Sequence, residues 1–311
     1  MNKDEKIYIA GHKGLAGSAI LRKLQNQGYK NIIYKSHQEL DLTQQHLVDK
    51  FFEIERPNYV ILAAAKVGGI YANNIYPAEF IYNNLMIECN VIHSAYRYGV
   101  MKLLFLASSC IYPKNVPQPI KEEYLLYNYL DSNHEAYAIA KIAGIKLCQY
   151  YKKQYGVNFI SCVPTNLYGP NDNFDLKNSH VIPALIRKFH DAKINNAPYV
   201  EVWGTGKPMR EIIHVDDLAD ACLFLMNNYD GDMWINVGSG EEVSIAELAN
   251  IIKEVIGYKG EIVFNTNYPD GPYRKLLDIN KLTKLGWQKK INLVDGLKST
   301  YEWYCNNIKN V

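Results

Sequence analysis

The sequence has almost no excess charge, no long apolar run and no paired-cysteine motif, and each absence excludes a class of protein. Its 34 lysines and arginines face 32 aspartates and glutamates and are scattered, which argues against nucleic acid or a membrane surface as a partner. Apolar stretches such as residues 59–65 are too short to span a bilayer, and no signal-like segment precedes Gly11, so we expect a cytoplasmic protein. The six cysteines show no CxxC or metal-ligand spacing, which predicts free thiols and no metal site.

What the sequence does contain is a regular alternation of strand and helix patterns. Over 311 residues, 48% of them hydrophobic, short β-branched runs alternate with segments that carry apolar residues at helical spacing. The order βαβαβ predicts an α/β protein with a doubly wound parallel sheet. Strands are expected at residues 6–10, 31–34, 59–64, 102–107 and 158–163, and helices at 16–27, 78–98 and 137–155.

The pattern changes at about Asn171. Beyond it come shorter pieces rich in Gly, Pro and Asn, which indicate a smaller, partly helical second lobe. A cleft between the two lobes is where a ligand is expected to bind. Helices are expected near residues 181–191, 216–226, 244–255 and 294–304.

A glycine motif stands between the first strand and the first helix. The stretch "GHKGLAG" places Gly11, Gly14 and Gly17 where the chain turns, where its backbone approaches a pyrophosphate and where a helix N-terminus stabilises an anion. Lys13, inside the loop, is within reach of a phosphate. The alternative is a tight turn that binds nothing.

The end of the second strand distinguishes between cofactors. NAD-binding folds usually carry an acidic residue there, which accepts the ribose 2′-hydroxyl. This chain reads "YKSHQELDL", with Lys35, Ser36 and His37 at the position and Asp41 only later. Cationic and polar groups favour NADP(H), whereas Glu39 or Asp41 folding back would restore an acid.

A tyrosine and a lysine lie four residues apart in "AYAIAK". Tyr137 and Lys141 therefore share one face of a helix, and an ammonium near a phenol is expected to lower its pKa and make it a usable proton donor. Ser108 follows the fourth strand, at the edge of the sheet where ligands bind in open α/β folds. A carbonyl/alcohol pair is the substrate chemistry that this trio suits.

With these residues in place, a family resemblance is evident. The stretches "GHKGLAGSAI", "AAAKVGGIYANN", "SSCIYP", "AYAIAKIAGIKLC", "PTNLYGPNDNF", "NSHVIPALI", "VWGTGKPMREIIHVDD" and "DGPYRKLLD" resemble the GDP-L-fucose synthase family of the extended short-chain dehydrogenase/reductase superfamily. The resemblance implies a Rossmann domain at residues 1–170 that binds NADP, with a returning segment near 203–240, and a lobe at 171–311 that mainly binds a sugar nucleotide. It also implies a GDP-linked 4-keto sugar as substrate, and a homodimer formed through helices at 86–98 and 141–155.

The resemblance assigns roles to individual residues. Tyr137 protonates the C4 ketone during reduction, Lys141 lowers its pKa and grips the nicotinamide ribose, and Ser108 holds the ketone oxygen. Epimerisation at C3 and C5 needs a base and an acid on opposite faces of the sugar, which the resemblance identifies as Cys110 and His180. The implied cofactor-binding residues are Gly11, His12, Lys13, Gly14, Leu15, Gly17, Lys35, Ser36, His37, Asp41, Leu42, Leu106, Ser108, Lys141, Pro164, Asn166, Leu167 and His180. The implied substrate-binding residues are Ser109, Asn166, Lys188, Trp203, Arg210, Arg274, Lys275 and Asp278.

Three departures from the family pattern leave alternatives open. Ala136 stands where the family has proline, Lys188 where it often has arginine, and His37 where it has arginine. A GDP-4-keto-heptose enzyme, or a C4-reductase without full epimerisation, therefore stays possible on the sequence. A dehydratase is disfavoured because Ser109 and Cys110 replace the threonine and acid that eliminate water, and a non-catalytic binding protein is disfavoured because every implied catalytic residue is present.

Overall fold

The computed structural model describes residues 1–176, 179–268 and 270–308. Its main sheet is parallel throughout, in the strand order β2-β1-β3-β4-β5-β9. The expected doubly wound α/β fold is confirmed. The strands of this sheet are β1 (Ile7–Ala10), β2 (Ile32–Ile33), β3 (Tyr59–Leu62), β4 (Lys102–Leu106), β5 (Asn158–Pro164) and β9 (Ile235–Val237).

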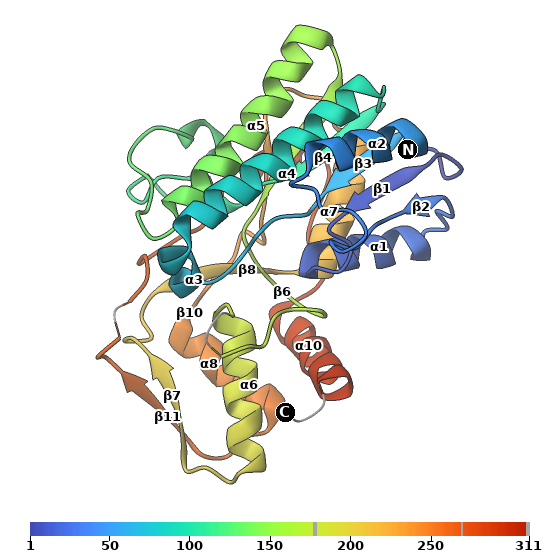
Figure 1. The fold of residues 1–311 in the computed structure, drawn as a ribbon. Coiled ribbons are helices and arrows are strands. Elements are labelled where there is room, and N and C mark those ends of the chain that lie inside the picture. The colour runs from blue at the N-terminus through green and yellow to red at the C-terminus, as the bar shows by residue number, and fades with distance from the viewer. Residues whose placement is uncertain (177–178, 269, 309–311) are drawn as a thin grey trace.

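Helices cover both faces of the main sheet (Figure 1). Along β1, Tyr8 and Ala10 pack into the core under α2, α4 and α5, while Ile7 and Ile9 pack into the core under α1 and α7. Alternating side chains therefore pack into two different apolar cores, as expected for a strand buried on both faces. These helices are α1 (Leu15–Asn26), α2 (Gln45–Glu55), α4 (Pro77–Arg97), α5 (Glu135–Tyr155) and α7 (Val215–Asn228), and the short α3 (Ile70–Ile75) precedes α4.

The C-terminal lobe has its own core and two small sheets, in the strand orders β10-β8-β6 and β11-β7. Its strands are β6 (Asn166–Tyr168), β7 (Tyr199–Trp203), β8 (Met209–His214), β10 (Glu242–Ser244) and β11 (Glu261–Asn265). Its helices are α6 (Val181–Ile194), α8 (Ile245–Ile256), α9 (Asn280–Lys284) and α10 (Leu293–Asn307). Through α7 and β9 the chain returns to the main sheet, where β9 pairs with β5.

None of the helices in the described ranges is long and apolar enough to cross a membrane.

Candidate active site

A cavity of about 460 Å³ lies between the carboxyl edge of the main sheet and the C-terminal lobe. This is the edge at which open α/β sheets bind ligands. Residues from distant parts of the chain converge on it, and most of the substrate-side and catalytic residues predicted from the sequence line its wall. These are Ser108, Cys110, Tyr137, Asn166, His180, Lys188, Trp203, Arg210, Arg274 and Lys275; Leu167, predicted to bind the cofactor, lines the wall as well.

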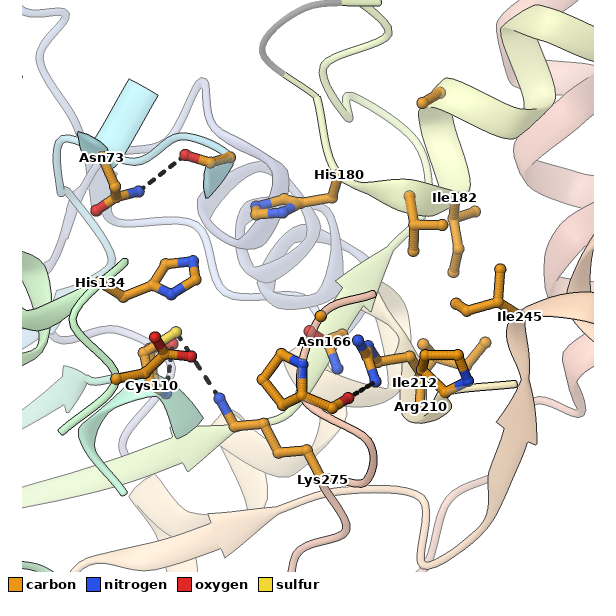
Figure 2. Close-up of a pocket in the computed structure, with 18 of the residues that line it drawn as sticks. Asn73, Cys110, His134, Asn166, His180, Ile182, Arg210, Ile212, Ile245 and Lys275 are labelled. Atoms are coloured by element: carbon orange, nitrogen blue, oxygen red, sulfur yellow. Dashed lines mark hydrogen bonds between the residues drawn. The ribbon is translucent and has the colours of Figure 1, made fainter. Parts of the chain in front are cut away.

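Cys110 is held at one end of this cavity by a short turn after β4. Ser108 precedes a 3-10 helix, η1 (Ser109–Ile111), and its Oγ accepts a hydrogen bond of 3.3 Å from the Cys110 backbone N–H. The Lys275 ammonium, from a segment far along the chain, lies 3.9 Å from the Cys110 Sγ (Figure 2). This contact places a positive charge directly beside the cysteine sulfur.

Two imidazoles share that end of the cavity with Cys110 (Figure 2). His180 precedes α6, and His134 precedes α5 three residues before Tyr137. Burial lowers the pKa of both, and for His134 the Lys275 charge acts in the same direction. Both rings are therefore mainly neutral at pH 7; each accepts a proton in this form and donates one from its protonated form. Sequence reasoning identified His180 but missed His134, although a histidine one turn before the Tyr-x-x-x-Lys pair was a usable signal.

Tyr137 also lines the cavity, but its electrostatics differ from the expectation. Burial raises its pKa well above the ordinary value; charges on Cys110 and Glu88 act in the same direction, and a hydrogen bond with Ser108 opposes them. The predicted net lowering of this pKa is therefore wrong for this structure, because burial outweighs the effect of any nearby positive charge. The Lys141 ammonium lies 5.8 Å from the centre of the Tyr137 ring and pairs instead with Glu88, at 3.1 Å. Tyr137 is thus protonated at neutral pH, the state that a proton donor needs.

The glycine loop has the shape that a bound pyrophosphate needs. Gly11 follows β1 with a φ of 90°, and the Gly14 N–H donates to the Gly11 carbonyl at 3.0 Å. A Cβ at Gly17, in the first turn of α1, would clash with the Gly11 carbonyl. Helix α1 therefore starts close against the loop, so that its N-terminus faces the space where an anion would sit. The residues present fit a dinucleotide.

Alanine at Gly17 is expected to distort this loop. The added methyl would meet backbone atoms, which cannot move aside as a flexible side chain can. We therefore predict a loss of about 1–3 kcal/mol in the free energy of unfolding, together with weaker binding of NADPH. Chemical denaturation and fluorescence titration measure the two effects. Alanine at Gly99, which has a φ of 72° and no atom near its Cβ, is the control for backbone strain alone: it should lower stability but leave NADPH affinity unchanged. Wild-type NADPH affinity in Gly17→Ala would contradict the assignment of this loop.

The segment after β2 presents both cations and acids. The Glu39 carboxylate folds back on Ser36, accepting from its backbone N–H at 2.8 Å and from its hydroxyl at 2.6 Å. Asp41 accepts from the Thr43 N–H at 2.9 Å, and its Oδ1 lies 3.7 Å from the His37 Nδ1. Lys35 and His37 are both exposed. Both acids left open by the sequence therefore approach this segment, Glu39 through Ser36 and Asp41 through His37.

The opposite end of the cavity combines aromatic and cationic groups. The Lys188 ammonium lies 4.6 Å from the centre of the Trp203 ring, whose other neighbour is Tyr268, stacked at 4.3 Å. The Arg210 guanidinium donates to the Pro272 carbonyl at 2.7 Å, and Arg274 pairs with Glu242. Figure 2 shows Arg210 among apolar side chains, away from Cys110. An aromatic face and cations at this end suit a nucleotide.

Two predicted substrate residues do not reach the cavity. Ser109 is 3% exposed, and Asp278, also buried, accepts a hydrogen bond of 2.9 Å from the Asn280 N–H. Neither is part of the cavity wall. Ser109 is turned into the protein by η1, and Asp278 caps the chain before α9.

A Rossmann sheet, a glycine loop and a Ser-Tyr-Lys set at the sheet edge define an extended short-chain dehydrogenase/reductase. Residues 7–238 match the NAD dependent epimerase/dehydratase family. The chain is 60% identical over 309 residues to GDP-L-fucose synthase 1 of Arabidopsis thaliana, covering 99% of this chain and 96% of that one. It is 52% identical over 313 residues to GDP-L-fucose synthase of Escherichia coli K12, covering 97% of each. Within the epimerase/dehydratase family, the chain belongs to the GDP-L-fucose synthase family.

One solved structure widens the comparison. The GDP-mannoheptose C4 reductase MlghC of Campylobacter jejuni, with NADP bound, is 46% identical and superimposes with a TM-score of 0.90, over 98% of this chain and 99% of that one.

Proposed function

We propose that this protein is an NADPH-dependent epimerase/reductase that converts a GDP-4-keto-6-deoxy sugar by C3 and C5 epimerisation and C4 reduction. The observation that carries the proposal is the convergence of Cys110, His180, Tyr137 and Ser108 on one cavity. A reductase alone needs only the tyrosine and the serine. A thiol and an imidazole facing the same space supply the second proton-transfer pair that epimerisation requires.

Epimerisation uses the end of the cavity that contains Cys110. The C4 ketone acidifies the neighbouring C–H bonds, and Cys110, beside the Lys275 ammonium, removes the proton. Ser108 hydrogen-bonds the ketone oxygen on which negative charge develops. His180 returns a proton on the opposite face of the ring.

Reduction uses Tyr137. NADPH, when bound along the glycine loop and the segment after β2, supplies the hydride. Tyr137, kept protonated by burial, donates its phenolic proton to the C4 oxygen, with Ser108 holding that oxygen in place. Lys141 lies on the same helix face and stabilises the phenolate left behind.

The nucleotide end of the cavity accounts for the GDP group. Arg210 and Lys188 offer positive charge to the diphosphate, and Trp203 lines the cavity beside Lys188. For the assembly, we propose a homodimer through α4 and α5, on whose surfaces Tyr82 and Tyr150 are each 61% exposed.

A second candidate is reduction of a GDP-4-keto heptose without epimerisation. It is favoured by the similarity to the Campylobacter jejuni C4 reductase and by Ala136, beside Tyr137, where the family has the larger proline. Both candidates use the same ketone chemistry and cofactor. They differ in the sugar accepted and in the use of Cys110.

Turnover of matched ketosugars distinguishes the two. The protein is incubated with NADPH and either GDP-4-keto-6-deoxymannose or a GDP-4-keto heptose; NADPH consumption is followed by absorbance, and product configuration is assigned by NMR. We expect the deoxyhexose to be consumed and its C3 and C5 to be inverted. Consumption of the heptose alone, with unchanged C3 and C5, would favour the second candidate.

Cofactor choice gives a further prediction. Replacing both Lys35 and His37 by alanine is expected to raise the KM for NADPH about tenfold, because a 2′-phosphate loses charged partners, and to leave the KM for NADH unchanged. Steady-state kinetics with each cofactor measure this. Lys30→Ala, another exposed lysine near β2, is the control. An equal rise for both cofactors would contradict a 2′-phosphate contact.

A further inference from the structure

A buried ion pair joins α4 and α5 beneath Tyr137, and the proposed mechanism assigns no role to its acidic member. The Glu88 carboxylate on α4 is 3.1 Å from the Lys141 ammonium on α5, and the two side chains are 1% and 2% exposed. The same ammonium donates to the Leu106 carbonyl at 3.1 Å and lies 4.6 Å from the centre of the Phe105 ring. Lys141 is therefore held from the sheet side and from α4 at once.

The surrounding residues leave room for this carboxylate but give it no other partner. Gly144, one turn after Lys141, has no side chain, and a Cβ there would lie 2.8 Å from Glu88 Oε2. Neither oxygen of Glu88 makes another hydrogen bond within the described part of the chain. A buried carboxylate with a single partner is expensive to keep, and an apolar side chain would fill this space at lower cost. Stability alone therefore does not account for Glu88.

We propose that Glu88 is a positioning residue for reduction: its carboxylate holds the Lys141 ammonium below Tyr137 and sets how much of that positive charge reaches the phenol. When Glu88 is ionised, Lys141 is shared between the carboxylate and Tyr137. When Glu88 takes up a proton, the whole charge is available to stabilise the phenolate that forms as Tyr137 gives up its proton. Reduction is then faster with Glu88 neutral.

The titratable groups facing Glu88 support this coupling. They are Lys141, Tyr137 and Cys148 on α5 and Cys89 on α4. Burial raises the pKa of the Glu88 carboxyl to about 7, with Lys141 opposing, and the Glu88 charge in turn raises the pKa of Tyr137. The carboxyl thus changes charge near neutral pH, where its effect on Tyr137 can be measured.

The positioning role of Glu88 rests on the proposed function, so two readouts are needed to test the role and the function separately. The first is the rate of hydride transfer in single turnovers with NADPH and GDP-4-keto-6-deoxymannose between pH 6 and 8. We expect this rate to fall roughly 3- to 10-fold as pH rises in the wild type, and to stay near its pH 6 value in Glu88→Gln. Glu88→Asp, which keeps the charge, should keep a pH dependence, and the exposed Glu302→Gln should match the wild type.

The second readout needs neither substrate nor cofactor. The buried carboxyl of Asp172 also has a pKa raised to about 7, so the Glu88 band is taken as the difference between the infrared spectra of the wild type and Glu88→Gln. In the free protein this difference band of the protonated carboxyl should disappear as the pH rises through about 7, and it should persist to higher pH in Lys141→Met, where the counter-charge is gone. A band that ignores Lys141→Met, or a Glu88→Gln pH profile identical to that of the wild type, would overturn the inference. Failure of the ketosugar to react would count against the proposed function only, because the infrared result still reports on the pair.

Discussion

Phenylalanine at position 137 is expected to lower the rate of C4 reduction by about 10²- to 10⁴-fold while leaving proton exchange at C3 and C5 intact. The phenol is the one proposed donor to the ketone oxygen, whereas Cys110 and His180 handle the carbon-bound protons separately. NADPH oxidation measures the first activity, and deuterium uptake from D₂O into the recovered ketosugar measures the second.

An exposed tyrosine outside the cavity wall offers a control for this variant. Tyr199→Phe, on β7, should behave as the wild type in both assays. If Tyr137→Phe reduces the ketone at the wild-type rate, the phenol is not the proton donor. If it loses exchange as completely as reduction, the two half-reactions do not use separate groups.

Alanine at Cys110 is expected to produce the complementary loss. Without the thiol, proton removal beside the ketone should slow by about 10²- to 10⁴-fold. Reduction retains Tyr137 and Ser108, so any product formed should keep the C3 and C5 configuration of the substrate. NMR of the product and of the recovered ketosugar measures this directly.

Its control is another partly accessible thiol. Cys305→Ala, on α10 and remote from the cavity wall, should leave exchange and product configuration unchanged. Inverted product from Cys110→Ala at the wild-type rate would transfer the role of base to another group, and His134, at the same end of the cavity, is the candidate to test (Figure 2).

The main sheet could be predicted from the sequence because the pattern that identifies each of its strands and helices lies within a single segment. Strands such as β1 and β3 are four-residue apolar runs buried on both faces, and α4 and α5 are long helices with an apolar stripe. Each pattern is complete within its own segment. Boundaries around the main sheet differed by one or two residues, as at α5, which begins at Glu135 instead of Tyr137, whereas α6 and α10 end three residues later than predicted.

The small sheets were not predicted because their strands depend on distant partners. β6 and β10 have three residues each, too few to show a recognisable period, and both pair with β8. The pairing of β9 with β5 joins residues about seventy positions apart. Tertiary contacts decide such strands.

The candidate site likewise has residues that could be predicted from the sequence and contacts that could not. Motif spacing identified Tyr137 and the glycine loop, and family resemblance identified Cys110 and His180. The Lys141–Glu88 pair and the contact of Lys275 with Cys110 could not be inferred, because each joins segments whose distance in space no local pattern encodes. The pKa of Tyr137 was predicted in the wrong direction for the same reason, since burial outweighs the neighbour four residues away.

One measurement tests the central claim most directly. The wild-type protein is given GDP-4-keto-6-deoxymannose and NADPH in D₂O, and the product is analysed by NMR and mass spectrometry. The account predicts a C4-reduced product with inverted C3 and C5, each carrying solvent deuterium. A reduced product that keeps both configurations and carries no deuterium at those carbons would contradict it.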